Sequence, residues 1–336
     1  MAIPALSDIL KNDTSAFAAG SGSPGGAPGE VQYNDAGSFA GANNVNIELG
    51  TLRLPVPGTE PTVPAAGGIK FYSKDIGGRI LPCFKGPSGI ETSLQSNIGK
   101  NSISVWQPAG NSTGITVTGD VALAAVGTAT AANWAATSLF TKLKRLDYLV
   151  TTAATSAVAG FRHAAAKWTV GNNNSTDKAG GFLFICTWGP ATGVATTTSR
   201  SFVGMGASTV APTDVEPSSI TNIVGMGWDA ADTNVQIMYR GTGAVSKIDL
   251  GANFPVPTTD RTKVYELTMF SPPNTTTQTV SYRVEDLTTG AVATGLITTN
   301  LPTTTTALAP RGWMSVGGTS SFIWFTLMRL YIETDI

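Results

Sequence analysis

Apolar and polar residues alternate in short runs along the C-terminal two thirds of the chain. In the clearest run, Val280, Tyr282 and Val284 alternate with polar residues, and segment 287–290 then turns the chain back. A period of two predicts a half-buried β-strand, and the following turn predicts a hairpin. Further runs lie at 115–121, 139–150, 182–188, 202–205, 223–228, 235–240, 246–250, 264–270, 291–298 and 322–332. Many short strands with frequent turns indicate a β-sandwich or jelly roll, which we place at residues 101–336.

Segment 46–96 has a different pattern, in which prolines break the strand-like runs. Six prolines, at positions 55, 57, 61, 64, 82 and 87, exclude a continuous helix and confine strands to edges or short pieces. We expect one copy of this segment to bury too little surface to order itself. Three copies wound about one axis would offer each strand partners on neighbouring chains. We therefore predict an interwoven, trimerising β shaft and connector over residues 30–100.

The N-terminal residues 1–29 combine a short apolar pattern with a flexible linker. The apolar positions Ile3, Leu6, Ile9 and Leu10 fit one amphipathic helix, which is too short to be stable alone. Residues 20–29 are composed of Gly, Ser, Pro and Ala, as in a flexible tether. We expect the helix to dock on another protein. The segment lacks the basic and apolar regions of a signal peptide.

A hairpin pattern follows the linker. Val31 and Tyr33 alternate with polar residues, segment 34–37 forms a turn, and Phe39 resumes the pattern. The string VQYNDAGSFAG resembles a short repeat, V-Q-[YF]-N-D-x-G-x-[FL]-x-G, of bacteriophage tail-fibre, neck-fibre and other virion appendage proteins. In those families the repeat lies just before or inside a trimeric shaft. The resemblance implies a homotrimer in which Val31, Tyr33 and Phe39 belong to the trimerising shaft.

Two longer segments resemble proteins of the same kind. Residues 67–89 look like the connector that many phage fibres place between shaft and head, and phrases across residues 195–336 look like the globular heads of phage structural proteins. The size of the C-terminal region suits one large sandwich of the legume-lectin or concanavalin type. The resemblance implies a virion protein that is assembled in the host cytoplasm. Residues Ile3, Leu6, Ile9 and Leu10 would then anchor it on tail, neck or capsid proteins.

Charge restricts the partners of this protein. Its 336 residues carry a net charge of −1, and only 13% of them are charged, against about 25% in an average soluble protein. Nucleic acid is therefore not an expected partner, because binding a polyanion needs many cations on one face. Residues 121–141 are uncharged, but they are mostly alanine with polar interruptions, so we expect no membrane insertion.

Cysteine and histidine offer little for catalysis or metal binding. Cys83 and Cys186 exclude a disulfide-dense scaffold, and two buried free thiols are favoured over one bridge. His163 is the only histidine, and without Cys or acidic neighbours at ligand spacing we interpret it as structural. We expect no cofactor.

Acidic residues occur close together in four places, which keeps one enzymatic alternative open. They are Asp214/Glu216, Asp229/Asp232, Glu285/Asp286 and Glu333/Asp335. Glycan-cleaving enzymes use two carboxylates about 5–9 Å apart. Polysaccharide-degrading fibres are, however, typically larger parallel β-helices, and no solenoid period is present here. We therefore predict that the protein is not an enzyme.

Tryptophans next to polar residues are candidates for glycan binding. Trp168 precedes a polar loop with Asn172 and Asn173, and Trp228 precedes Asp229. An exposed indole stacks on the apolar face of a sugar while the amides and carboxylate bind its hydroxyls. For both indoles we favour the other interpretation, in which they pack in the core or at a subunit interface. Trp188 and Trp324 lie inside apolar strands and are expected in the core.

Two further clusters of charged and polar residues remain. Asp229, Asp232 and Asn234 offer oxygen ligands for calcium, although they also suit an ordinary turn, which we favour. Lys142, Lys144 and Arg145 form the only basic cluster, interpreted as the solvated face of a strand or, alternatively, as a contact for an acidic lipopolysaccharide or a virion protein.

The resemblance to virion appendage proteins, taken with these patterns, implies a fibre-type virion protein. Its head would bind a host-surface polysaccharide or lipopolysaccharide. The alternatives are a neck or capsid fibre that decorates the particle without a dedicated receptor and, less favoured, a glycan-degrading appendage.

Overall fold

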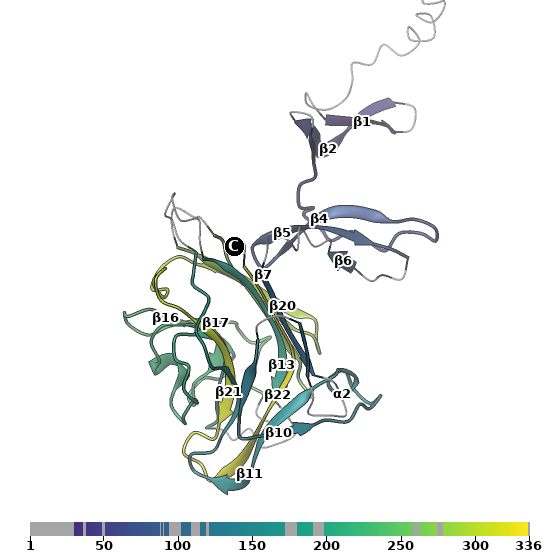
Figure 1. Ribbon diagram of the computed structural model, residues 1–336. Helices are drawn as coiled ribbons and strands as arrows, with labels where there is room; N and C mark the ends of the chain where they lie inside the picture. The colour runs from purple at the N-terminus through teal and green to yellow at the C-terminus, as the bar shows by residue number, and fades with distance from the viewer. Residues whose placement is uncertain are drawn as a thin grey trace, which may run out of the picture. The chain divides into compact units, whose positions relative to one another are not determined.

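The computed structural model describes residues 30–35, 38–48, 51–87, 89, 91–93, 102–108, 115–118, 121–171, 180–190, 198–257, 262–273 and 278–334 (Figure 1). The chain divides into two compact units. The smaller comprises Met1–Asp75 and Ile80–Leu94, and the larger, called the head here, comprises Ile76–Arg79 and Gln95–Ile336. The division after Leu94 compares with the boundary expected at residue 100. The predicted anchor residues Ile3, Leu6, Ile9 and Leu10 lie outside the described residues.

The smaller unit contains two three-stranded antiparallel sheets. One consists of β1 (Glu30–Asp35), β2 (Ser38–Glu48) and β3 (Thr51–Arg53), and the other of β4 (Lys70–Ile76), β5 (Arg79–Lys85) and β6 (Glu91–Ser93). β1 and β2 pair as a tight hairpin, with Asn34 opposite Phe39. The predicted hairpin is therefore confirmed, with Val31 and Tyr33 in β1.

The strands of the smaller unit find their partners within one chain. This corrects the expectation that each strand must borrow hydrogen bonds from sister copies. A small interior also exists, since Tyr72 and Cys83 are buried. At its surface the exposed Glu60 binds both Lys74 (3.2 Å) and Lys85 (3.1 Å). The apolar surface of this unit, in contrast, is poorly covered. Among the residues of this unit whose side chains the structure describes, seven large apolar ones are exposed: Ile47, Leu52, Val56, Val63, Ile69, Phe71 and Ile80.

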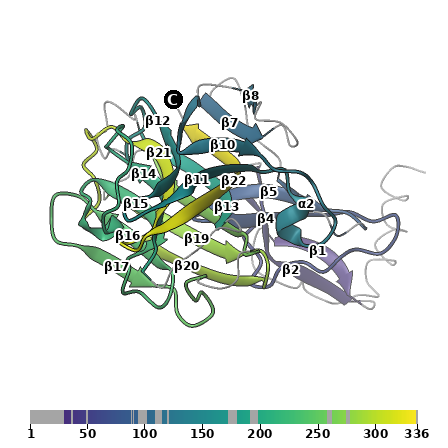
Figure 2. The ribbon, with the colours of Figure 1, turned by 90° about the horizontal axis from the view of Figure 1, so that it is seen from below.

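The head is built from two antiparallel sheets. The nine-stranded sheet has the order β10-β11-β22-β13-β18-β19-β20, and β7 pairs with both β22 and β8. Figure 2 shows β19 and β20 side by side at the end of this sheet. Its strands are β7 (Ser102–Pro108), β8 (Ile115–Thr118), β10 (Thr128–Ala131), β11 (Leu146–Ala154), β13 (Phe182–Pro190), β18 (Tyr265–Ser271), β19 (Val280–Asp286), β20 (Ala291–Ile297) and β22 (Ser321–Thr334).

The second sheet has seven strands in the order β17-β16-β15-β14-β21-β12-β9. They are β9 (Leu123–Val126), β12 (Val158–His163), β14 (Arg200–Gly206), β15 (Ile223–Trp228), β16 (Gln236–Arg240), β17 (Ser246–Asp249) and β21 (Ala309–Ser315). A 3-10 turn, η1 (Pro217–Ser219), lies between β14 and β15 in the chain. None of the helices among the described residues has the length and apolarity needed to cross a bilayer.

Aromatic side chains from both sheets meet in the core of the head. Trp188 of β13 stacks on Phe325 of β22, with ring centroids 5.3 Å apart, and on Trp228 of the opposite sheet, at 6.0 Å. Phe161 of β12 also contacts Phe325 at 5.7 Å. Because the two sheets share these contacts and one continuous apolar interior, the predicted all-β sandwich is confirmed.

Both cysteines are buried free thiols. This agrees with the interpretation favoured from the sequence over a single bridge. Burial raises the pKa of the Cys186 thiol well above its usual value, since the interior disfavours the thiolate. A thiol held protonated in this way is unreactive.

The strand predicted over 139–150 is wrong in its first half. Residues Leu139–Lys142 form a short helix, α2, and β11 begins only at Leu146. Ser138 begins the helix, because its hydroxyl accepts the Thr141 N–H (3.3 Å) while the Thr141 hydroxyl accepts the Ser138 N–H (3.0 Å). The basic cluster is therefore not one strand face.

Arg145 shows most clearly that this cluster is divided. It is buried, and its guanidinium donates to the carbonyl oxygens of Thr141 (3.0 Å) and Asn133 (2.9 Å). Lys142 and Lys144 are exposed, Lys142 on α2 and Lys144 on the segment before β11.

Candidate functional site

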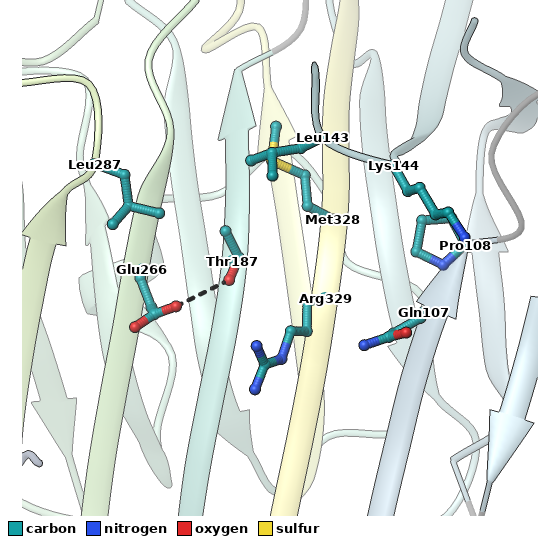
Figure 3. A pocket seen from close by; sticks show the side chains of 9 residues that line it. All are labelled: Gln107, Pro108, Leu143, Lys144, Thr187, Glu266, Leu287, Met328 and Arg329. Atoms are coloured by element: carbon teal, nitrogen blue, oxygen red, sulfur yellow. Dashed lines mark hydrogen bonds between the residues drawn. The ribbon is translucent and has the colours of Figure 1, made fainter. Parts of the chain in front are cut away.

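A β-bulge in β22 interrupts the regular alternation of side chains along that strand. Thr187 of β13 lies opposite Arg329, whereas the next residue, Trp188, lies opposite Leu327, so Met328 is an extra residue. Leu327 and Leu330 both point into the core. Met328 and Arg329 therefore both project from the outer face of the nine-stranded sheet (Figure 3). Bulges are frequent near binding sites because they redirect a side chain in this way.

The bulge forms part of a groove on this outer face. A row of polar side chains crosses neighbouring strands, with Glu266 of β18 opposite Thr187, Thr187 opposite Arg329, and Gln107 on the next strand, β7. The groove has a volume of about 290 Å³. Its lining comprises Gln107, Pro108, Leu143, Lys144, Thr187, Glu266, Leu287, Met328 and Arg329.

An apolar wall borders the polar row. Met328 packs with Phe140 of α2 and with Val264 in a small cluster separate from the main core, and Leu143 and Leu287 pack against that cluster. In Figure 3 Leu143 lies against Met328, and Lys144 extends alongside Pro108. α2 replaces the expected strand, and Leu143, directly after α2, lies against Met328 in this wall.

The polar groups of the groove include both donors and acceptors. The Thr187 hydroxyl donates to a Glu266 carboxylate oxygen at 3.2 Å, and the second oxygen of that carboxylate is a further acceptor. The side chains of Gln107, Lys144 and Arg329 are exposed. An arrangement of directed polar groups beside an apolar surface is typical of small-ligand sites.

The two tryptophans proposed for glycan stacking lie elsewhere. Trp228 is fully buried against Trp188, so the prediction that it stacks on a sugar is wrong. Trp168 is also buried and packs edge-on against His163, with ring centroids 5.6 Å apart. The core interpretation therefore holds for both indoles. Asn172 and Asn173 lie outside the described residues.

His163 has the structural environment expected of it. Its ring is buried, and its Nδ1 lies 3.1 Å from the backbone N–H of Ala165, which donates to it. It lies on β12 of the seven-stranded sheet and is not among the groove-lining residues.

The possible calcium ligands form an ion-paired turn. The Lys247 ammonium binds Asp229 at 3.0 Å and Asp232 at 2.6 Å, so both carboxylates already share a protein cation. Asn234 directs its amide N–H groups to Asp249 (3.1 and 3.2 Å), and an amide that donates presents no oxygen ligand in that direction. These residues do not fit calcium. Because Asp229 is nearly buried within this turn, it also does not serve as a glycan ligand beside Trp228.

The other acidic pairs are held by cations in the same way. Among the described residues the pairings are Asp214 and Glu216 with Arg200 (both 2.9 Å), Glu285 with Arg283 (2.7 Å), Asp286 with Lys263 (2.6 Å) and Glu333 with Arg79 (2.7 Å). Asp335 lies outside the described residues. These carboxylates have structural partners and do not line the groove, where Glu266 is the carboxylate present.

Asp214 gives one of these networks a pH dependence. Burial raises its pKa, but hydrogen bonds from Ser315, Gly318 and Gly317, together with the charge of Arg200, outweigh burial and leave the pKa below its usual 3.8. A lowered pKa stabilises the fold above the unfolded-state pKa, and this stabilisation is lost as the pH falls below about 4. We expect the urea midpoint of the head to fall between pH 5 and pH 3. An Asp214→Asn variant should be less stable at pH 5 and should show a smaller fall. An unchanged pH dependence in this variant would contradict the assignment.

No protein-family model and no curated protein sequence matches the chain. Solved structures with a similar fold include arcelin-5, a lectin-like defence protein from Phaseolus vulgaris (5% identity, 70% of this chain and 98% of that one, TM-score 0.42). A protein of unknown function from Shewanella oneidensis MR-1 is 9% identical over 72% of this chain and 90% of its own, with a TM-score of 0.46. Peanut lectin with a bound peptide is 11% identical over 70% and 97%, with a TM-score of 0.44. At these identities the likeness concerns the fold alone.

Proposed function

We propose that this chain forms a homotrimeric fibre of a bacteriophage virion and that its β-sandwich head binds a host-surface polysaccharide in the groove of the nine-stranded sheet. The observation that carries the proposal is the bulge that directs Met328 and Arg329 together onto the outer face. A sugar needs both kinds of surface found there. Its hydroxyls need donors and acceptors such as Gln107 and Glu266, and its C–H faces need an apolar wall such as Met328 and Leu143.

The fibre role is supported by the N-terminal part of the chain. The VQYNDAGSFAG string, with its resemblance to virion appendage proteins, forms the β1–β2 hairpin of the smaller unit. In this proposal residues 1–29 attach the fibre to tail, neck or capsid proteins. Three heads per fibre and several fibres per particle would convert weak saccharide contacts into lasting attachment.

The exposed apolar side chains of the smaller unit support assembly by side-chain contacts. A soluble monomer rarely exposes so many large apolar groups in a small unit, because burying them against a partner is favourable. We expect full-length protein to scatter light as a trimer, with three times the 34.6 kDa mass of one chain. The double variant Phe71→Ser, Ile80→Ser removes two side chains that are 52% and 62% exposed and should shift the protein to monomers.

A matched variant controls for the mere loss of an apolar side chain. Val292 of β20 is 48% exposed on the head, and Val292→Ser should leave the mass unchanged. A folded wild-type monomer at micromolar concentration would contradict the trimer. Loss of the trimer in the Val292 variant would place the interface on the head instead.

Blocking the groove tests the binding site directly. Gln107 is exposed on β7, so Gln107→Trp should fill the groove without disturbing the core and should abolish binding to a panel of bacterial surface polysaccharides. Thr294→Trp places the same indole on exposed β20, away from the groove-lining residues, and should bind like the wild type. Equal binding by all three proteins would exclude the groove. Release of reducing sugar from a bound polysaccharide would favour the glycan-degrading alternative.

The place of the fibre on the particle distinguishes a receptor-binding fibre from a decorative one. If the chain is a receptor-binding tail fibre, full-length protein at saturating concentration should block phage adsorption. As a neck or capsid fibre, labelled antibody should decorate those sites and adsorption should continue. Absence of the chain from purified particles would contradict both.

A further inference from the structure

We propose that the groove selects saccharides that carry a carboxylate, such as uronic-acid polymers, over neutral ones; this inference rests on the proposed saccharide-binding function of the same groove. It follows from the charged side chains that line the groove and from the partners that neighbouring charged side chains have within the head.

The groove contains two cations whose charges are not neutralised by a described residue. Lys144 and Arg329 are exposed, line the groove, and form no ion pair or hydrogen bond with any of the residues that the structure describes. The neighbouring Arg145, in contrast, donates hydrogen bonds to two carbonyl oxygens. Its guanidinium carbon also lies 5.3 Å from the centre of the Phe140 ring. Two exposed cations of this region, Lys144 and Arg329, therefore line the same groove, whereas the exposed Lys142 does not.

The negative charge of the groove belongs to Glu266, which lies at the β18 end of the polar row. Glu266 is separated from Gln107 by Thr187 and Arg329, one residue on each of the two intervening strands. Strands lie about 4.8 Å apart, so the row from β18 to β7 extends roughly 14 Å. Thr187 donates to Glu266, and Glu285, which is opposite Glu266 on β19, is bound by Arg283. Asp147, on the other side of β22, accepts the Thr326 hydroxyl at 2.7 Å.

This polarity matches an acidic sugar in one orientation. The planar guanidinium of Arg329 is suited to a carboxylate, which it can bind through two parallel hydrogen bonds, and the Lys144 ammonium adds a second positive charge. Ring hydroxyls would then donate to Glu266 and pair with the Gln107 amide. A neutral sugar would leave both cations without an ionic partner, so it forfeits the strongest contacts that the groove offers.

The test compares polymers that differ in little except their charge. Full-length protein is immobilised, and binding is measured for polygalacturonate, for its carboxyl-reduced galactan and for a glycerol-phosphate teichoic acid. We expect polygalacturonate to bind at least about tenfold more tightly than the reduced galactan, because hydrogen bonds to charged groups are the stronger ones. Added salt should weaken binding of the acidic polymer more than binding of the neutral one.

Variants assign the selectivity to named side chains. Arg329→Gln should remove most of the difference between the acidic and the reduced polymer, and Lys144→Gln should remove part of it. Lys142→Gln removes an exposed cation two residues away that does not line the groove, and it should change neither affinity. Glu266→Gln should weaken binding of both polymers, and the preference for the acidic polymer should remain.

The outcomes separate this inference from the function on which it rests. Equal binding of the acidic and reduced polymers, a preference for teichoic acid, or binding only of neutral polysaccharides from the panel would overturn the carboxylate preference and leave saccharide binding intact. Unchanged selectivity in Arg329→Gln would also overturn it. Failure to bind any polysaccharide would instead remove the proposed function.

Discussion

Replacing Trp228 by alanine is expected to destabilise the β-sandwich head by about 3–5 kcal/mol, because truncating a buried tryptophan loses its packing and leaves a cavity. Trp228 is fully buried and stacks on Trp188, which in turn contacts Phe325 and Tyr265 at 5.3 and 5.6 Å. A domain of this kind has a total stability of about 5–15 kcal/mol, so the variant should unfold at a much lower urea concentration.

An exposed tryptophan provides the control for this change. Trp134 is 59% exposed, and Trp134→Ala should shift the free energy of unfolding by no more than about 0.5 kcal/mol. Both proteins are compared by urea unfolding, with near-ultraviolet circular dichroism to report on aromatic packing. If Trp228→Ala kept its unfolding midpoint but lost saccharide binding, the core assignment would be wrong and the sugar-stacking candidate from the sequence would return.

Trp228 shows what the sequence could and could not predict, because the same residue suited both a buried indole and one that contacts a sugar. Strict alternation, as in Val280, Tyr282 and Val284, reports which face of a strand is buried, and β19 has that pattern in the structure. In a sandwich both faces of a central strand can be covered. β15 is buried along its whole length, so a polar residue after its tryptophan did not signal an exposed indole.

The groove itself depends on two features that a period of two conceals. The first is the bulge, which places Met328 and Arg329 on one face although they are neighbours in sequence. Its signal in the sequence is the string Leu-Met-Arg-Leu, in which the alternation skips one position. The second is the Ser138 cap, which begins a helix in a stretch whose apolar residues equally suit a strand.

The sequence also did not show whether acidic residues close together in the chain form a site or pair with cations. Closeness along the chain does not reveal which cation each carboxylate meets, because Lys247 and Lys263 come from other parts of the chain. The hairpin turn after β19 was predicted correctly, whereas the buried ion pair beneath it was not. That ion pair leads to the second large expected effect.

Replacing Asp286 by alanine is expected to cost about 3–5 kcal/mol, because it leaves a nearly buried ammonium without its partner. The Asp286 side chain is fully buried and binds Lys263 at 2.6 Å. Its other carboxylate oxygen accepts the backbone N–H groups of Thr288 (2.9 Å) and Thr289 (3.3 Å), so the alanine variant also loses the hydrogen bonds that fix the turn.

A second substitution distinguishes the unpaired charge from the lost turn. In Asp286→Ala, Lys263→Met the buried ammonium is removed, so a large part of the stability should return, and the remaining deficit measures the turn hydrogen bonds. Glu285→Ala is the control next in sequence. Its ion pair with Arg283 is partly exposed and should be worth no more than about 1 kcal/mol. Urea unfolding of the four proteins at pH 7 measures these differences. If the double variant were no more stable than Asp286→Ala, the unpaired Lys263 would not be the source of the loss, and the turn would carry the effect alone.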